Sequence, residues 1–362
     1  MPDGRASLVL VFGSDPDVKR LQRPLAEVAR VWAEHVVLGC STPAHLPTDA
    51  TSASPIPPSI VLTVARFDRT ELQHCHVDVA AAGGPRAAGR AIATQMASPS
   101  LRGVFVVGDG TLSSGATLAA GFAERLPGIA LTGGFAAETD TVPASWTLVD
   151  GMCRSGHVSA VGFVSEHLEL GFGTAGGWDV FGPERLVTQS YGNVLYELDG
   201  RPALSLYADY VDAAADDLAH LAVGFPFAIR DLDDRTVVRA VTSVNTATDS
   251  LRLAGDVSQG AVAQLLQSSP DHLVEGAHLA AGQASIGSEQ LAIAISCVGR
   301  RRVLGNRTGE ELDAAREALA ADVHVTGFYS LGTLAPAIGG SDHHNQVMTI
   351  TTMREHADPV SA

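Results

Sequence analysis

The sequence predicts an α/β protein with two interlocked lobes of mixed sheets covered by helices, and with an antiparallel, hairpin-rich section in its second half. The chain has 362 residues, more than the roughly 250–300 residues at which a single hydrophobic core stops growing. Hydrophobic residues make up 46% of the chain and charged residues 18%, a balance typical of folded globular proteins. A strand–helix–strand pattern recurs three times, with continuous apolar strands of the kind that helices bury.

The first of the three units begins with an apolar strand over residues 7–12. A helix should follow, with Asp15 as its N-cap and Pro16 at its first position. Five apolar residues recur at helical spacing along it: Val18, Leu21, Leu25, Val28 and Trp32. A second apolar strand, over residues 36–38, leads into the turn Gly39, Cys40, Ser41 and Thr42.

The second and third units repeat this order. Strands at 104–107 and 129–131 flank a helix over about residues 114–124, and the second strand leads into Gly133, Gly134 and Phe135. In the third unit, Thr308 and Glu311 predict a capping box for the helix between strands at 291–295 and 323–325. Because ligand sites gather at the strand ends of such sheets, we expect the three turns to share a pocket.

The sequence between the second and third units has the pattern of an antiparallel sheet. Residues 194–207 predict a hairpin with Asp199 and Gly200 in a type I′ turn, and further strands are expected near 225–227, 237–244 and 251–253. We place the first lobe at residues 1–185, the second lobe at 186–355 and a frayed tail at 356–362.

Charge and cysteine usage restrict the partners and the compartment. The formal net charge of −16 makes nucleic acid an improbable partner, because such a surface repels phosphate. The apolar run at 8–12 is too short to predict a signal peptide core or a membrane span, so no membrane partner is expected. Four widely spaced cysteines match no metal pattern and predict reduced thiols in a cytoplasmic protein.

Several segments, taken in order, resemble the FIST family of bacterial sensory domain proteins. Residues 39–42, Gly133-Gly134 and 196–203 resemble its N-terminal part and junction, and residues 296–300, 327–332, Pro336 and 344–346 resemble its C-terminal part. The resemblance implies a protein that binds a small ligand, such as an amino acid, and passes a signal to a separate partner such as a histidine kinase. Some relatives are heme-based nitric-oxide sensors, so heme is the one cofactor that the resemblance suggests.

Two positions depart from the family pattern. The family continues with a Gly-Glu pair after both the first turn and the tyrosine segment, whereas this chain has Ala44-His45 and Gly332-Thr333. Both acidic positions are therefore lost, and we expect a less cationic ligand.

The candidate ligand-binding residues come from these turns, from the segment 296–300 and from the polar segment 344–346 that precedes an apolar strand. Arg300 beside Cys297 suggests either a clamp for a ligand carboxylate or a thiol with a lowered pKa. The full candidate set is Gly39, Cys40, Ser41, Thr42, Gly133, Gly134, Phe135, Cys297, Gly299, Arg300, Tyr329, Ser330, Gly332, Thr333, His344, Asn345 and Gln346.

Two alternatives to a ligand sensor stay open at this point. One is a hydrolase or lyase that uses the same pocket, with Cys297 or Ser41 as nucleophile and His45 as general base. The other is a heme-based nitric-oxide sensor, although none of the thirteen histidines stands out as an axial ligand. No metal site is predicted.

Overall fold

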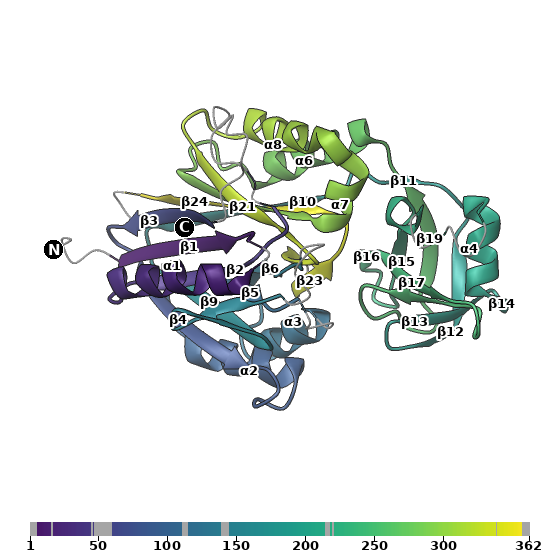
Figure 1. Ribbon diagram of the computed structural model, residues 1–362, viewed down its shortest axis with the longest axis horizontal. Coiled ribbons are helices and arrows are strands. Elements are labelled where there is room, and N and C mark those ends of the chain that lie inside the picture. The colour runs from purple at the N-terminus through teal and green to yellow at the C-terminus, as the bar shows by residue number, and fades with distance from the viewer. Residues whose placement is uncertain are drawn as a thin grey trace.

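The computed structural model describes residues 6–15, 17–44, 46, 60–110, 115–138, 145–213, 218, 221–337 and 339–356. These residues form a large lobe and a small lobe (Figure 1). The small lobe is one stretch of chain, from β11 (Asp179–Val180) to β19 (Val262–Gln267), and the large lobe holds the chain on both sides of it. The segment 186–355 therefore contributes to both lobes. Of the predicted tail, residues 357–362 lie outside the described residues.

Three sheets make up the large lobe. The first has the order β3 (Ile60–Phe67), β1 (Ala6–Gly13), β2 (Val36–Ser41), β7 (Thr147–Val149) and β8 (Met152–Arg154). The second has the order β23 (Gly340–His344), β22 (Thr333–Ala337), β6 (Ala130–Phe135), β5 (Leu101–Gly108), β9 (His157–Val164) and β4 (Glu71–Asp78). The third has the order β10 (Leu168–Ala175), β24 (Met348–Glu355), β20 (Leu291–Cys297) and β21 (His324–Ser330).

Each sheet contains the same three-stranded unit. A central strand pairs in parallel with one neighbour and antiparallel with the other: β1 with β2 and β3, β5 with β6 and β9, and β20 with β21 and β24. A helical segment joins each parallel pair, namely α1 (Val18–Val31), α3 (Gly115–Ala123), and α7 (Val298–Leu304) with α8 (Thr308–Glu317). The three predicted strand–helix–strand units are confirmed.

The inner faces of the three sheets share one hydrophobic core. Phe12, Phe105, Phe163 and Phe328 lie in it, and the ring centroids of Phe12 and Phe328 are 4.6 Å apart. Helices cover the outer faces: α1 covers the first sheet, α2 (Pro85–Met96) and α3 cover the second, and α6 (Pro270–Ala284) and α8 cover the third. The central strands β1, β5 and β20 are nearly continuous apolar runs because both of their faces are buried.

The small lobe is antiparallel throughout its described strands. Their order is β16 (Thr236–Arg239), β15 (Phe227–Arg230), β19, β12 (Arg185–Tyr191), β13 (Val194–Leu198), β18 (Ser250–Leu253) and β17 (Val241–Asn245), with β11 on β19 and β14 (Arg201–Pro202) on β13. Asp199 and Gly200 both have positive φ, at 51° and 73°, as a type I′ turn requires. The predicted hairpin-rich section is confirmed.

Three local predictions need correction. The strand expected up to residue 207 ends at Pro202 and gives way to the helix α4 (Ala203–Val211), whose apolar face packs into the small-lobe core. Helix α1 begins at Val18, because Asp17 rather than Asp15 caps it through a bond from the Lys19 N–H. Glu311 does not form a capping box, because its carboxylate points into the interior and is fully buried.

Candidate functional site

The turns after β2, β6 and β21 meet inside the large lobe. Thr42 Oγ1 donates to the Tyr329 carbonyl at 3.0 Å, and the Tyr329 N–H donates to Thr42 Oγ1 at 3.0 Å. Ser330 Oγ accepts from the Phe135 N–H at 3.0 Å. Ser41 Oγ donates to the Ala137 carbonyl at 3.1 Å. These hydroxyl groups therefore fix the three turns against one another, since protein partners already use them.

A cavity of about 320 Å³ opens elsewhere, at the edge of β3, but the predicted turns do not line it. The cavity that involves them has a volume of about 370 Å³ and lies between the two lobes. We call it the inter-lobe cavity. Its walls are Gly110, Phe135, Asn193, Val223, Ala240, Val241, Thr242, Leu253, Ala254, Cys297, Val298, Gly299, Arg302, Leu331, Gly332, His343 and Gln346. Five predicted site residues are among them: Phe135, Cys297, Gly299, Gly332 and Gln346.

Gln346 is the most constrained side chain of this wall. Its backbone has a φ of 61°, a left-handed conformation that non-glycine residues seldom adopt. The side chain is fully buried, and its Nε2 donates to the Val223 carbonyl of the small lobe at 3.0 Å. Within the described residues its Oε1 has no hydrogen-bond partner. Gln346 thus holds a fully buried acceptor without a partner among the described residues, beside the cavity.

His343 presents a second unpaired polar atom. The residue is 5% exposed, and its Nδ1 is buried without a partner among the described residues. Burial, and after it the nearby Arg239 guanidinium, lower the pKa of His343 well below its ordinary value, so the imidazole is neutral at neutral pH. Its ring meets Phe135 edge-on at a centroid distance of 5.4 Å.

Two glycines make room for these side chains. A Cβ at Gly299 would overlap the amide of Gln346, and a Cβ at Gly332 would overlap Nε2 of His343. Both glycines are therefore required by packing at the cavity wall. Gly299 lies in helix α7 and Gly332 follows β21, and the sequence alone did not reveal why either must be glycine.

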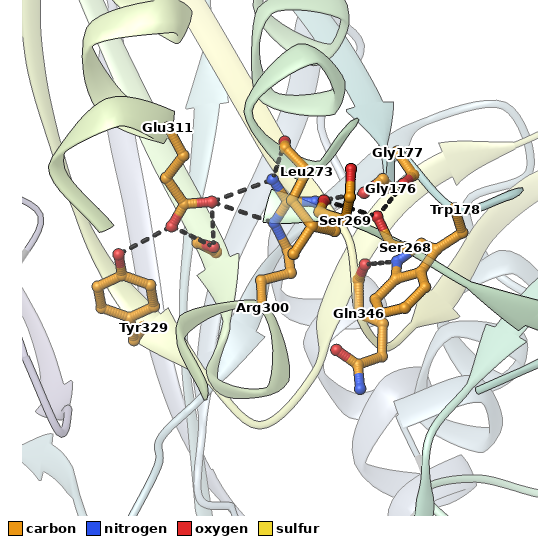
Figure 2. Close-up of polar contacts among 11 residues, drawn as sticks. Gly176, Gly177, Trp178, Ser268, Ser269, Leu273, Arg300, Glu311, Tyr329 and Gln346 are labelled. Atoms are coloured by element: carbon orange, nitrogen blue, oxygen red, sulfur yellow. Dashed lines mark hydrogen bonds and ion pairs between the residues drawn. The ribbon is translucent and has the colours of Figure 1, made fainter. Parts of the chain in front are cut away.

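Arg300 occupies a different place from the one predicted. Its side chain is fully buried and pairs with Glu311, with NH2 and Nε at 3.0 Å and 3.1 Å from the carboxylate oxygen Oε2 (Figure 2). NH1 also donates to the Gly176 carbonyl at 2.5 Å, and NH2 donates to the Leu273 carbonyl at 2.7 Å. The predicted ligand clamp is corrected, because protein acceptors occupy the guanidinium and Arg300 does not line the cavity.

This buried pair lies beside both connections between the lobes. Gly176 precedes β11, the first strand of the small lobe, and Ser268 follows β19, its last strand. The two connections are bonded to each other, because Ser268 Oγ donates to the Gly177 carbonyl at 2.5 Å. Trp178, on the entering connection, donates from Nε1 to the Gln346 carbonyl at 2.5 Å (Figure 2). The cavity wall and the inter-lobe connection are thus in direct contact.

The candidate nucleophiles are poorly placed for catalysis. Burial raises the pKa of the Cys297 thiol, although backbone N–H groups of Gly299 and Gln346 oppose the shift, so the thiolate is disfavoured. Ser41 Oγ already donates to Ala137 and accepts from the Trp146 N–H at 3.1 Å. His45, the proposed base, lies outside the described residues.

The other predicted residues lie away from the inter-lobe cavity. Cys40 is fully buried in the shared core, where burial raises its pKa. Thr333 Oγ1 accepts from Thr349 Oγ1 at 2.9 Å. Asn345 donates from Nδ2 to the Leu331 carbonyl at 3.1 Å, while its buried Oδ1 has no partner among the described residues. The remaining predicted residues outside the lining are Gly39, Thr42, Gly133, Gly134, Tyr329, Ser330 and His344.

Sequence reasoning missed His343 and the whole small-lobe wall. His343 and His344 are neighbours in β23, so their side chains point to opposite faces of the sheet. The sequence does not indicate which of these two faces meets the cavity. The small-lobe wall consists mainly of small apolar residues, which carry no chemical signal and come from distant parts of the chain.

Comparison with known proteins places the chain in a family. A FIST N domain model matches residues 7–201, and a FIST C domain model matches residues 203–336. Comparison with curated proteins gives no match. Among solved structures, a cyanuric acid hydrolase from A. caulinodans aligns over 97% of this chain and 90% of its own, with 10% identity and a TM-score of 0.36. That likeness is too weak to support an argument about activity.

The structure has no helix within its described residues that is long and apolar enough to cross a membrane. FIST domains are sensory domains, and the two matched domains adjoin one another along the chain. Since the matches cover nearly all of its residues, this chain belongs to the FIST family.

Proposed function

We propose that this protein is a sensor that binds a small ligand in the inter-lobe cavity. The observation that carries the proposal is a cavity walled by both lobes, two of whose lining residues, Gln346 and His343, each hold a buried polar atom without a partner among the described residues. A buried polar atom without a partner costs about 1–3 kcal/mol. A ligand that displaces this wall would let these groups find partners, and such a displacement is what a sensor needs. The cavity volume of about 370 Å³ suits a small metabolite.

The same residues offer a route from binding to signal. Residues 343–346 of the large lobe bond to the small lobe at two points. Arg239 donates to the His343 carbonyl at 2.7 Å, and Gln346 Nε2 donates to the Val223 carbonyl. Trp178 adds a bond from the connection to the Gln346 carbonyl. A ligand that engages Gln346 would therefore act on the contacts that set the lobe positions. A separate partner, such as a histidine kinase, would read the new arrangement.

The test begins with protein purified from heme-replete cells and examined by native mass spectrometry. We expect a small bound mass, or binding by a metabolite in calorimetry, that Gly299→Ala abolishes by displacing the Gln346 amide. Gly309→Ala is the matched control, because a Cβ there meets nothing within 4 Å. Equal binding by wild type and Gly299→Ala would contradict the site.

The same sample distinguishes the two alternatives. A strong Soret band would replace the proposal with a heme sensor. Turnover of a bound metabolite that Cys297→Ala abolishes would favour the enzyme, although the raised thiol pKa argues against it. Retained ligand binding in Cys297→Ala, without turnover in either protein, is the result expected of a sensor.

A further inference from the structure

Two arginines are buried among the described residues, and only one of them has a counter-charge in contact with it. Arg300 pairs with the Glu311 carboxylate at 3.0 Å. Arg239 is 4% exposed, and it forms no ion pair with the described residues. Burial lowers the pKa of Arg239 from 12.5 to about 10, so its guanidinium is still charged at neutral pH. Since buried charges in proteins are normally paired, Arg239 lacks a partner that a ligand would supply.

The hydrogen bonds of Arg239 leave one nitrogen unused. Nε donates to the Asp256 carbonyl at 3.4 Å, and NH1 donates to the Val238 and His343 carbonyls at 3.4 Å and 2.7 Å. NH2 donates to none of the described residues. It is also not one of the fully enclosed side-chain atoms, so a molecule can reach it. Arg239 therefore keeps N–H donors for an acceptor from outside the chain.

Arg239 lines a second cavity between the lobes, with a volume of about 240 Å³, which we call the Arg239 cavity. Its large-lobe wall comes from α3 and from β23, which lies beside β16 of the small lobe (Figure 1). Its small-lobe wall comes from β15, β16 and the segment between β18 and β19. The Arg239 cavity and the inter-lobe cavity share His343, but their other lining residues differ.

Three described carboxylates also line this cavity, and none of them pairs with Arg239. Asp231 pairs with Arg235 at 2.9 Å and accepts from two N–H groups of its own loop. Asp342 lies 3.9 Å from Arg235. Asp256 is exposed and gives Arg239 only its carbonyl oxygen. Because Asp256 and Asp342 act on the guanidinium at longer range, the cavity suits a single negative charge better than a double one.

The rest of the wall is largely aliphatic. Four alanines between residues 116 and 123 lie on one face of α3, at positions i, i+3, i+4 and i+7. Ile229, Val237 and Ala261 of the small lobe line the same space. Their small side chains leave room for a short hydrocarbon chain, which would gain free energy by leaving water.

We propose that the Arg239 cavity binds a short aliphatic monocarboxylate, whose carboxylate accepts from NH2 of Arg239 while its chain packs against α3. Ser341 adds a second donor at the cavity, because its Oγ accepts from the Leu131 N–H at 3.0 Å and keeps its own hydrogen. An uncharged amide would accept the same bonds but would leave the buried charge uncompensated. This site is separate from the inter-lobe cavity, so the inference goes beyond the proposed function and does not depend on it.

Calorimetry of the full chain with butyrate, butyramide and butylamine tests the inference, because the three share a four-carbon skeleton and differ in charge. We expect butyrate to bind. Butyramide should bind at least about 10-fold more weakly, since a hydrogen bond between two charged groups is stronger than one to a neutral acceptor. Butylamine should not bind, because its ammonium group would face the Arg239 guanidinium.

Two variants remove the site in different ways. In Gly255→Ala the new Cβ would lie 2.8 Å from Nε and 3.1 Å from Cζ of Arg239, so the guanidinium must move and butyrate binding should be lost. Ala120→Leu keeps Arg239 in place but fills the α3 side of the cavity, and it should abolish binding as well. Gly309→Ala is the control and should bind butyrate like wild type, because its Cβ meets nothing within 4 Å.

The outcomes separate this inference from the proposed function. Equal binding of butyrate and butyramide, binding of butylamine, or no binding of butyrate overturns the inference. Butyrate binding that survives both Gly255→Ala and Ala120→Leu overturns it too. If Gly299→Ala abolishes butyrate binding and Gly255→Ala does not, the carboxylate occupies the inter-lobe cavity, which supports the proposed function and overturns this inference. We expect the opposite pattern, with wild-type butyrate affinity in Gly299→Ala.

Discussion

Replacing Arg300 with alanine should destabilise the protein in the absence of any ligand. Arg300 and Glu311 are both fully buried, and their ion pair is closed on every side by protein groups. In Arg300→Ala the Glu311 carboxylate would keep only the hydroxyl donors of Ser296 and Tyr329, at 3.0 Å and 2.8 Å. The carbonyls of Gly176 and Leu273 would lose their donor as well.

The magnitude follows from the uncompensated charge. Removing one partner of a buried ion pair typically costs about 3–5 kcal/mol. A protein with a free energy of unfolding of about 5–15 kcal/mol would lose a large share of its stability. At about 2 °C per kcal/mol, the thermal midpoint should fall by at least about 6 °C. The double variant Arg300→Met, Glu311→Met should lose less than the sum of its single variants, because it leaves no charge behind.

Thermal and urea unfolding of the ligand-free protein measure this loss. Arg302→Ala is the control: it lies in the same helix, is exposed and should change the free energy of unfolding by less than about 0.5 kcal/mol. An Arg300→Ala protein that unfolds like wild type but binds ligand poorly would refute the structural assignment and restore the ligand clamp.

Three further predictions concern the cavity and its surroundings. Burial lowers the pKa of His344 from its ordinary value of 6.5 to about 4, and lowers that of His343 as well, so the unfolded chain binds more protons below pH 6.5. As the pH falls from 7 to 5.5, the free energy of unfolding should therefore decrease by about 1 kcal/mol for each histidine. Urea midpoints of wild type and His344→Gln at both pH values measure this decrease, and an equal decrease in the two proteins would contradict the prediction. A thiol reagent, with peptide mapping to locate the label, should modify the half-buried Cys153 before Cys297, which is 3% exposed. Faster labelling of Cys297 would contradict its burial. Ligand binding should change the fluorescence of Trp178, which is bonded to Gln346, whereas Trp178→Phe should abolish that change; a signal that persists in the variant would place the coupling elsewhere.

Local sequence determined the repeated framework of this protein. Each apolar run is long enough for one buried strand, and each is followed by a glycine turn, so the three strand–helix–strand units could be predicted without knowing their neighbours. The type I′ turn at Asp199 and Gly200 is equally local, because it depends on which residues tolerate positive φ. The prediction of α4 as a strand failed where the small-lobe core decided the outcome.

Tertiary structure decided which polar groups are used and which remain. Arg300 followed a suggestive cysteine, but its partners Gly176, Leu273 and Glu311 come from three separate elements, and no local pattern indicates that they converge. Gln346 was predicted for its polarity, yet its role at the cavity depends on Val223 in the other lobe, which takes its N–H group and leaves its oxygen free. Sequence patterns fix backbone periodicity over a few residues, whereas the pairing of a buried side chain depends on which distant segments packing brings within hydrogen-bond distance.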